Sequence, residues 1–167
     1  KIARLDSSRE AIVDVSSGRR QTFGELDNRV SKLSNGFINE FRLNKGDRVA
    51  ILSKNCAQFL EVVYATMRTG FIAQPLNWRL GVSELVKIVE DGAPSVIVVG
   101  KDFKEIGEEL SKKITVPNWL WINSENEDDY EKFLTRFSEE EPVLSVPLEK
   151  DDPGLILYTG GTTGESK

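Results

Sequence analysis

The chain has 167 residues and a formal net charge of −5, with 39% hydrophobic and 29% charged residues. A chain of this length can bury roughly 70% of the surface that its unfolded form exposes, which is enough for one hydrophobic core. The acidic balance argues against a nucleic-acid binder, because binding a phosphate backbone requires a basic face. A small anion remains a candidate ligand, since a few backbone amides and one lysine can hold it locally.

The scarcity of cysteine and histidine excludes several kinds of site. Cys56 is the only cysteine and there is no histidine, which excludes an internal disulfide, a thiolate metal cluster, a histidine-ligated zinc ion and Ser-His or Cys-His nucleophile pairs. One cysteine fits a reducing compartment, so we expect a cytoplasmic protein. We expect no membrane span, because the apolar stretches are far shorter than ~20 residues. The first residues contain neither a signal core nor an initiating Met, which predicts a cut piece of a longer chain.

The chain begins with a predicted hairpin followed by a helix. Two short strand-like runs, 10–15 and 19–23, are separated by a Ser-Ser-Gly turn. Thr22 and Glu25 then form a capping box, in which the threonine hydroxyl accepts from the third helical amide. Apolar residues recur at helical spacing beyond it, which predicts an amphipathic helix over 24–41.

Strands and helices alternate from there on. Residues 48–54 predict a strand, and 56–69 predict a helix that Asn55 and Gln58 cap and that should be buried, because it is apolar nearly all round. The further expected elements are a strand and turn over 70–77, a helix over 83–92, a strand over 95–100, a helix over 102–113, a strand over 118–123 and a helix over 128–137. The strand over 95–100 is a continuous β-branched run, typical of a strand covered on both faces. This alternation predicts an α/β fold with a largely parallel sheet and helices on both faces.

The C-terminal part has a different composition. Residues 138–152 are acidic and lack a hydrophobic period, so we expect a surface connection that leads to a strand over 154–159. Residues 158–167 read YTGGTTGESK. Glycines let backbone N–H groups point at one anion, because they adopt positive φ without penalty, while threonine hydroxyls and a lysine add donors and charge. Such a loop suits a polyphosphate accompanied by magnesium.

Two alternatives exist for this loop. In the Walker P-loop the lysine follows a glycine and precedes a Ser or Thr, whereas here Lys167 follows Ser166 and nothing follows it. The sequence therefore does not match the Walker motif. A plain glycine-rich turn between strands is the other alternative, and composition alone favours it.

The loop resembles the signature YTSGTTGxPK of the adenylate-forming enzymes, a superfamily of acyl- and aryl-CoA synthetases, adenylation domains of peptide synthetases and luciferases. The departures are Gly160 in place of serine, which removes a hydroxyl donor, and Ser166 in place of proline, which should loosen the exit of the loop. The order of segments is similar along nearly the whole chain. PLNWRL at 75–80 in particular resembles fatty-acyl and other acyl-CoA synthetases.

The resemblance implies that residues 1–167 are an N-terminal piece of the AMP-binding domain of such an enzyme, cut within its phosphate loop. The parent would be an AMP-forming acid–thiol ligase that uses ATP and Mg²⁺ to activate a carboxylic acid, expected to be a fatty acid, and transfers it to coenzyme A. The residues implied to hold the phosphates are Thr159, Gly160, Gly161, Thr162, Thr163, Gly164 and Lys167. The family's adenine, magnesium and catalytic residues lie beyond Lys167, so the piece alone should be inactive.

Two other function classes stay open, a nucleotide-hydrolysing protein and a non-catalytic α/β scaffold, and a homodimer is also left open. Among the remaining conspicuous side chains, we expect Trp78 and Arg79 to fix a turn and pack. Of Trp119 and Trp121, one should face the core and the other a crevice or cover. We expect Cys56 to be a buried small hydrophobe.

Overall fold

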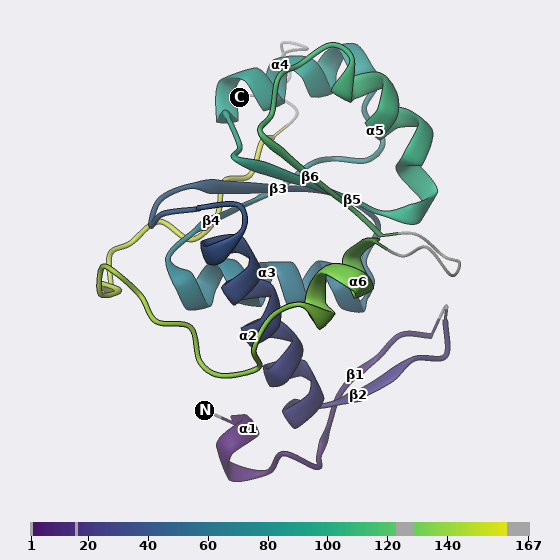
Figure 1. The fold of residues 1–167 in the computed structure, drawn as a ribbon. Coiled ribbons are helices and arrows are strands. Elements are labelled where there is room, and N and C mark those ends of the chain that lie inside the picture. Colours follow the sequence, from purple (N-terminus) through teal and green to yellow (C-terminus); the bar gives the residue numbers. More distant parts are fainter. Residues whose placement is uncertain (1, 16, 123–128, 160–167) are drawn as a thin grey trace.

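The computed structural model describes residues 2–15, 17–122 and 129–159. Its centre is a four-stranded parallel sheet with the strand order β4-β3-β5-β6 (Figure 1). The strands are β3 (Arg48–Leu52), β4 (Ile72–Pro75), β5 (Val96–Val99) and β6 (Asn118–Trp121). An antiparallel hairpin of β1 (Glu10–Val13) and β2 (Arg20–Thr22) follows a short helix, α1 (Ile2–Leu5). The expected hairpin and parallel sheet are therefore confirmed.

Helices cover both faces of the sheet, as the sequence predicts. One face packs against α2 (Phe23–Asn39), α3 (Ala57–Thr69) and α6 (Asp129–Thr135). The other packs against α4 (Val82–Gly92), the 3-10 turn η1 (Lys101–Phe103) and α5 (Lys104–Ser111). In β5, Val96 and Val98 belong to the first core, whereas Ile97 and Val99 belong to the second. This division confirms the two-sided burial expected from the β-branched run.

The N-terminal cap of α2 agrees with the prediction from the sequence, whereas that of α3 does not. The capping box of α2 is present, because the Glu25 amide donates to Thr22 Oγ1 at 3.2 Å and the Thr22 amide donates to Glu25 Oε2 at 2.8 Å. These bonds lower the pKa of Glu25. The cap predicted for α3 is wrong, because Cys56 occupies the N-cap position and makes no side-chain cap bond. Its thiol lies 3.7 Å from the Ser53 hydroxyl and is only half-buried, contrary to the expected full burial.

Two expectations about side-chain faces are also wrong. Helix α3 was expected to be buried all round, but Leu60, Tyr64 and Met67 are 38%, 46% and 61% exposed. Their spacing of three to four residues places them on one helix face, which neither the sheet nor α2 covers. Trp119 and Trp121 do not diverge, since alternate residues of a strand share a face. Their rings stack with centroids 5.8 Å apart and pack against the second core.

Helices α2 and α6 approach closely at Gly36, where a larger residue would collide with an aromatic cluster. A Cβ atom at Gly36 would lie 2.3 Å from the ring of Phe133, which is buried between Phe41 and Phe137. We expect Gly36→Ala to lower the free energy of unfolding by about 2 kcal/mol, because the overpacking exceeds alanine's helix-propensity gain of about 1 kcal/mol. Urea unfolding measures the change. Gly154→Ala is the control, since no atom lies within 4 Å of a Cβ there. Equal midpoints for the two variants would contradict the prediction.

Residues 138–152 connect α6 to the β4 side of the sheet, and most of them are exposed. Lys45 holds this connection by donating to the Pro147 carbonyl at 2.9 Å and by pairing with the Asp152 carboxylate at 2.7 Å. A hydrogen bond from the Glu149 amide and the Lys45 charge lower the pKa of Asp152. Of the helices in the described ranges, none has the length and apolarity needed to cross a membrane.

Candidate functional site at the carboxyl edge of the sheet

The last described residues run beside β4 toward the carboxyl edge of the sheet. The Ala73 amide donates to the Gly154 carbonyl at 3.0 Å, and the Ile156 amide donates to the Ala73 carbonyl at 2.9 Å. The next bond of a parallel ladder would require an N–H at Pro75, which proline lacks. Residues 154–159, predicted as a strand, therefore pair with β4 through one isolated bridge and do not form a strand in the structure.

A cleft of about 240 Å³ opens where this segment passes α4 and the loop after β4. It is lined by Pro75, Leu76, Asn77, Leu80, Ile88, Leu157 and Tyr158. Parallel α/β sheets bind their ligands outside the carboxyl ends of the strands. The cleft occupies that position, and it adjoins the start of the predicted phosphate loop.

Tyr158 is the side chain that ties this segment to the fold. Its hydroxyl donates to Asp91 Oδ2 at 2.5 Å, and its ring packs against the second core. Burial and the neighbouring carboxylate raise the pKa of Tyr158 to about 12. The phenol therefore stays protonated and acts as a donor near neutral pH.

Of the residues predicted to hold phosphates, Thr159 is described and exposed. The others lie outside the described residues: Gly160, Gly161, Thr162, Thr163, Gly164 and Lys167. Within the described ranges, no three acidic or cysteine side chains gather in a way that could hold a metal ion.

Trp78 and Arg79 follow β4 at the same edge and behave as packing residues, as expected. The Arg79 amide donates to Asn77 Oδ1 at 3.1 Å, which fixes the turn. Trp78 packs 5.9 Å from the ring of Phe103, and the Arg79 guanidinium lies over the indole at 4.1 Å from its centroid. Lys54 also lies near that indole, at 5.6 Å.

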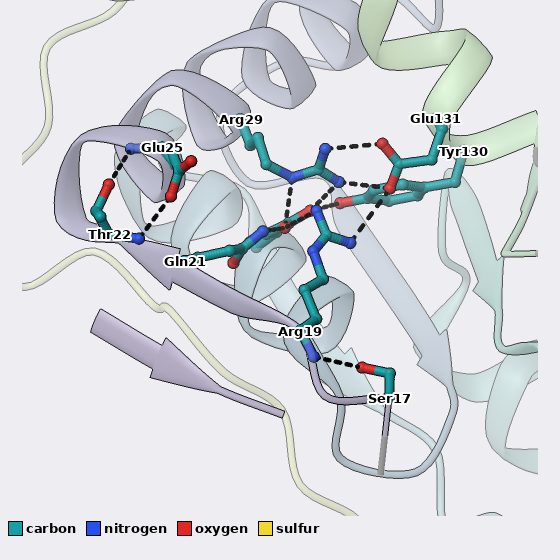
Figure 2. A network of polar contacts seen from close by, with 9 residues as sticks. Ser17, Arg19, Gln21, Thr22, Glu25, Arg29, Tyr130 and Glu131 are labelled. Atoms are coloured by element: carbon teal, nitrogen blue, oxygen red, sulfur yellow. Dashed lines mark hydrogen bonds and ion pairs between the residues drawn. The ribbon is translucent and has the colours of Figure 1, made fainter. Parts of the chain in front are cut away.

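A buried ionic network between the hairpin and the helices is the second group of unusual polar residues (Figure 2). Glu61 of α3 is fully buried. Its Oε1 accepts from Gln21 Nε2 at 2.8 Å and from Arg29 Nε at 2.6 Å. Its Oε2 accepts from Arg29 Nη2 at 3.0 Å and from the Tyr130 hydroxyl at 2.8 Å. Both carboxylate oxygens are therefore engaged within the protein.

Arg29 joins this carboxylate to a second one. It donates to the two oxygens of Glu131 at 2.7 Å each, and Arg19 lies 3.4 Å from the same carboxylate. Burial alone would lower the pKa of Arg29, but the carboxylates of Glu131 and Glu61 outweigh it, so the pKa is raised. Burial alone would raise the pKa of Glu131, but the nearby Arg29 and Arg19 outweigh it, so the pKa is lowered. Full burial is the largest cause of the raised pKa of Tyr130.

Perturbed pKa values indicate a functional site when the groups line a cleft, but structural ion networks also produce them. Here Glu61 has no exposed surface and its partners come from β2, α2 and α6. We therefore assign the network a structural role, which is to fasten the hairpin and α6 to α2 and α3. Sequence reasoning missed it, although a glutamate inside an otherwise apolar helix was a usable signal.

Acidification should weaken this network through Glu131. The pKa of Glu131 is lowered below its ordinary value of 4.5 in the folded protein. Its contribution to stability is therefore present above the unfolded pKa and is lost as pH falls through the folded one. Urea unfolding at pH 7, 4.5 and 3 should show a shallower loss of stability for Glu131→Gln than for the unchanged protein. Glu10→Gln, at a half-exposed surface carboxylate, is the control. An unaltered pH dependence in Glu131→Gln would refute the assignment.

Comparison with known proteins adds a family to this geometry. A family model described as AMP-binding enzyme matches residues 1–167. The chain is 34% identical over 152 residues to a feruloyl-CoA synthase from Amycolatopsis sp, which covers 90% of this chain and 28% of that protein. It is 28% identical over 160 residues to the long-chain-fatty-acid–CoA ligase FadD13 of Mycobacterium tuberculosis, which covers 95% of this chain and 31% of that protein. The chain thus spans less than a third of these curated relatives.

Solved structures agree with the sheet and helix arrangement. The inhibitor-bound N-terminal domain of FACL13 from Mycobacterium tuberculosis superposes with a TM-score of 0.86 at 25% identity, over 99% of this chain and 40% of that one. ATP-bound MatB from Rhodopseudomonas palustris gives a TM-score of 0.81 at 26% identity, over 99% of this chain and 33% of that one.

Proposed function

Because the chain belongs to the AMP-binding enzyme family, we propose that it forms the N-terminal part of an ATP-dependent acyl-CoA synthetase. The observation that carries the proposal is the position of Tyr158, the first residue of the signature sequence, which lines a cleft at the carboxyl edge of a parallel sheet. Relatives named as CoA ligases and a relative solved with ATP support the same chemistry.

In this proposal the loop residues hold ATP while a carboxylic acid is activated. The acid's carboxylate attacks the α-phosphorus, which forms an acyl-adenylate and releases pyrophosphate. The thiol of coenzyme A then displaces AMP and leaves a thioester. Backbone amides of the glycines, the threonine hydroxyls and the Lys167 ammonium would bind the β- and γ-phosphates and spread the charge of the leaving pyrophosphate. Mg²⁺ would neutralise the phosphates, and the residues that hold it would lie beyond Lys167.

The proposed acid is a fatty acid. The PLNWRL segment and the similarity to FadD13 support it. The feruloyl-CoA synthase relative has a higher identity and makes an aromatic acid the competing substrate class. The 167-residue piece alone should be inactive, and the full-length enzyme would act in the cytoplasm.

ATP–pyrophosphate exchange by the full-length enzyme tests this function. The assay uses acetate, medium-chain, long-chain and aromatic acids, with and without coenzyme A. Exchange that requires one acid class would support adenylation and identify the substrate, and thioester formation with coenzyme A would identify the acceptor. Acid-independent phosphate release would indicate a nucleotide hydrolase instead. A folded protein that neither exchanges nor binds nucleotide would indicate a scaffold.

A further inference from the structure

The segment that leads into the loop pairs with β4 at a single bridge, where Ala73 makes two backbone hydrogen bonds, one to Gly154 and one to Ile156. Leu155 and Leu157 point largely to solvent, with 51% and 61% of their surface exposed. Tyr158 is the residue of 154–159 that joins a core cluster. Its side chain therefore joins the segment to the core at the point where the loop begins.

The partner of Tyr158 is a carboxylate in a position that does not favour the helix carrying it. Asp91 lies in the last turn of α4, which contains no basic residue. The C-terminus of a helix carries a partial negative charge, so an acidic side chain there destabilises the helix unless something compensates. The Arg48 guanidinium compensates the helix end by donating to the Gly92 and Ala93 carbonyls at 2.9 and 2.6 Å. The Asp91 carboxylate itself accepts from the Tyr158 hydroxyl, which comes from 67 residues further along the chain.

We propose that Asp91 and Tyr158 form an anchor that positions the phosphate loop, with both acting as positioning residues that do not themselves contact ATP. Tyr158 immediately precedes Thr159, the first predicted phosphate ligand. The aromatic ring lies against α4 and lines the cleft, and its hydroxyl bond fixes the ring there. Any displacement of the ring moves the backbone from which the loop starts. This inference rests on the proposed function.

Four substitutions in the full-length enzyme separate positioning from general stability. Tyr158→Phe removes only the hydroxyl, and Asp91→Leu removes the acceptor. Both should raise the KM for ATP in pyrophosphate exchange about fivefold and leave the KM for the acid unchanged, because loss of one charge-assisted hydrogen bond loosens the loop. Asp91→Asn keeps an oxygen acceptor and should restore most of the affinity. Glu90→Gln removes a neighbouring exposed charge of the same helix turn and is the matched control.

A second measurement on the same proteins does not depend on activity. Deuterium uptake by the peptide 154–159 should be several-fold faster in Tyr158→Phe and Asp91→Leu than in Glu90→Gln, because the Ile156 amide bond to Ala73 opens more often. Unchanged uptake in Tyr158→Phe would overturn the anchor. Faster uptake with an unchanged KM for ATP would also overturn it, since the bond would then serve only stability. If the unaltered enzyme shows no acid-dependent exchange, the proposed function fails, and uptake still decides whether the anchor exists.

Discussion

Replacing Glu61 with alanine is expected to lower the free energy of unfolding by about 3–5 kcal/mol. The substitution leaves the Tyr130 hydroxyl and the Gln21 amide without their acceptor in a fully buried position. It also leaves the Arg29 guanidinium with one carboxylate where it now has two. Because an unsatisfied buried donor retains its desolvation cost, these losses exceed that of a surface ion pair. Urea unfolding at pH 7, followed by far-UV circular dichroism, measures the change.

Two variants define what the Glu61 result means. Glu10→Ala removes a carboxylate that is 48% exposed and pairs with the exposed Arg20, so it should cost less than about 1 kcal/mol. Glu61→Gln keeps the size of the side chain and one oxygen acceptor but replaces the other oxygen with an amide donor and removes the charge, so its cost should fall between those of the two alanine variants. If Glu61→Ala costs no more than Glu10→Ala, the network does not fasten the hairpin and α6 to the fold.

Replacing Lys167 with alanine should reduce acid-dependent pyrophosphate exchange by the full-length enzyme about 100-fold, which is typical for loss of one preorganised electrostatic contact to the reacting phosphates. In the proposed function Lys167 supplies the loop's positive charge, and the glycine amides and threonine hydroxyls cannot replace it. The loss should appear mainly in kcat, because the pyrophosphate gains charge as it leaves.

The control for Lys167 is Lys150→Ala, which removes an exposed lysine from the preceding connection. This variant should exchange at the rate of the unaltered enzyme. The unfolding midpoints of both variants should match that of the unaltered enzyme, which separates a catalytic effect from a folding effect. Normal exchange in Lys167→Ala would remove the loop from the proposed mechanism.

The sequence predicted those parts of the fold that short-range patterns specify. The β-branched run around Val96–Val99 indicated a strand buried on both faces, and Thr22 with Glu25 indicated the start of α2. The errors lie where tertiary packing decides. The Asn55 cap is wrong because α3 starts one residue later than predicted, at Ala57. One face of α3 is exposed because packing leaves it uncovered, although its composition is apolar.

Of the candidate site, the sequence could indicate residue types but not partners. The sequence of residues 158–167 predicts a phosphate loop, and this stays a prediction because most of those residues lie outside the described ranges. By contrast, the bond between Tyr158 and Asp91 joins residues 67 positions apart, and no periodicity links them. Because Glu61 lies in an otherwise apolar helix, the sequence indicates a buried carboxylate that needs a cation as its partner. That Arg29 supplies it depends on how α2 crosses α3, which composition does not specify.

The order of synthesis gives the segment at 154–156 a protective role. The four strands of the sheet in the described residues lie between residues 48 and 121, so they leave the ribosome before this segment does. Until then the backbone groups of Ala73 face outward from β4, and an unpaired strand of this kind is a template for aggregation with other chains. The shortness of β4 and the missing N–H of Pro75 limit that hazard. Docking of residues 154–156 then covers Ala73, so the segment that leads to the predicted phosphate loop also pairs with the backbone of β4 that is left open in the nascent chain.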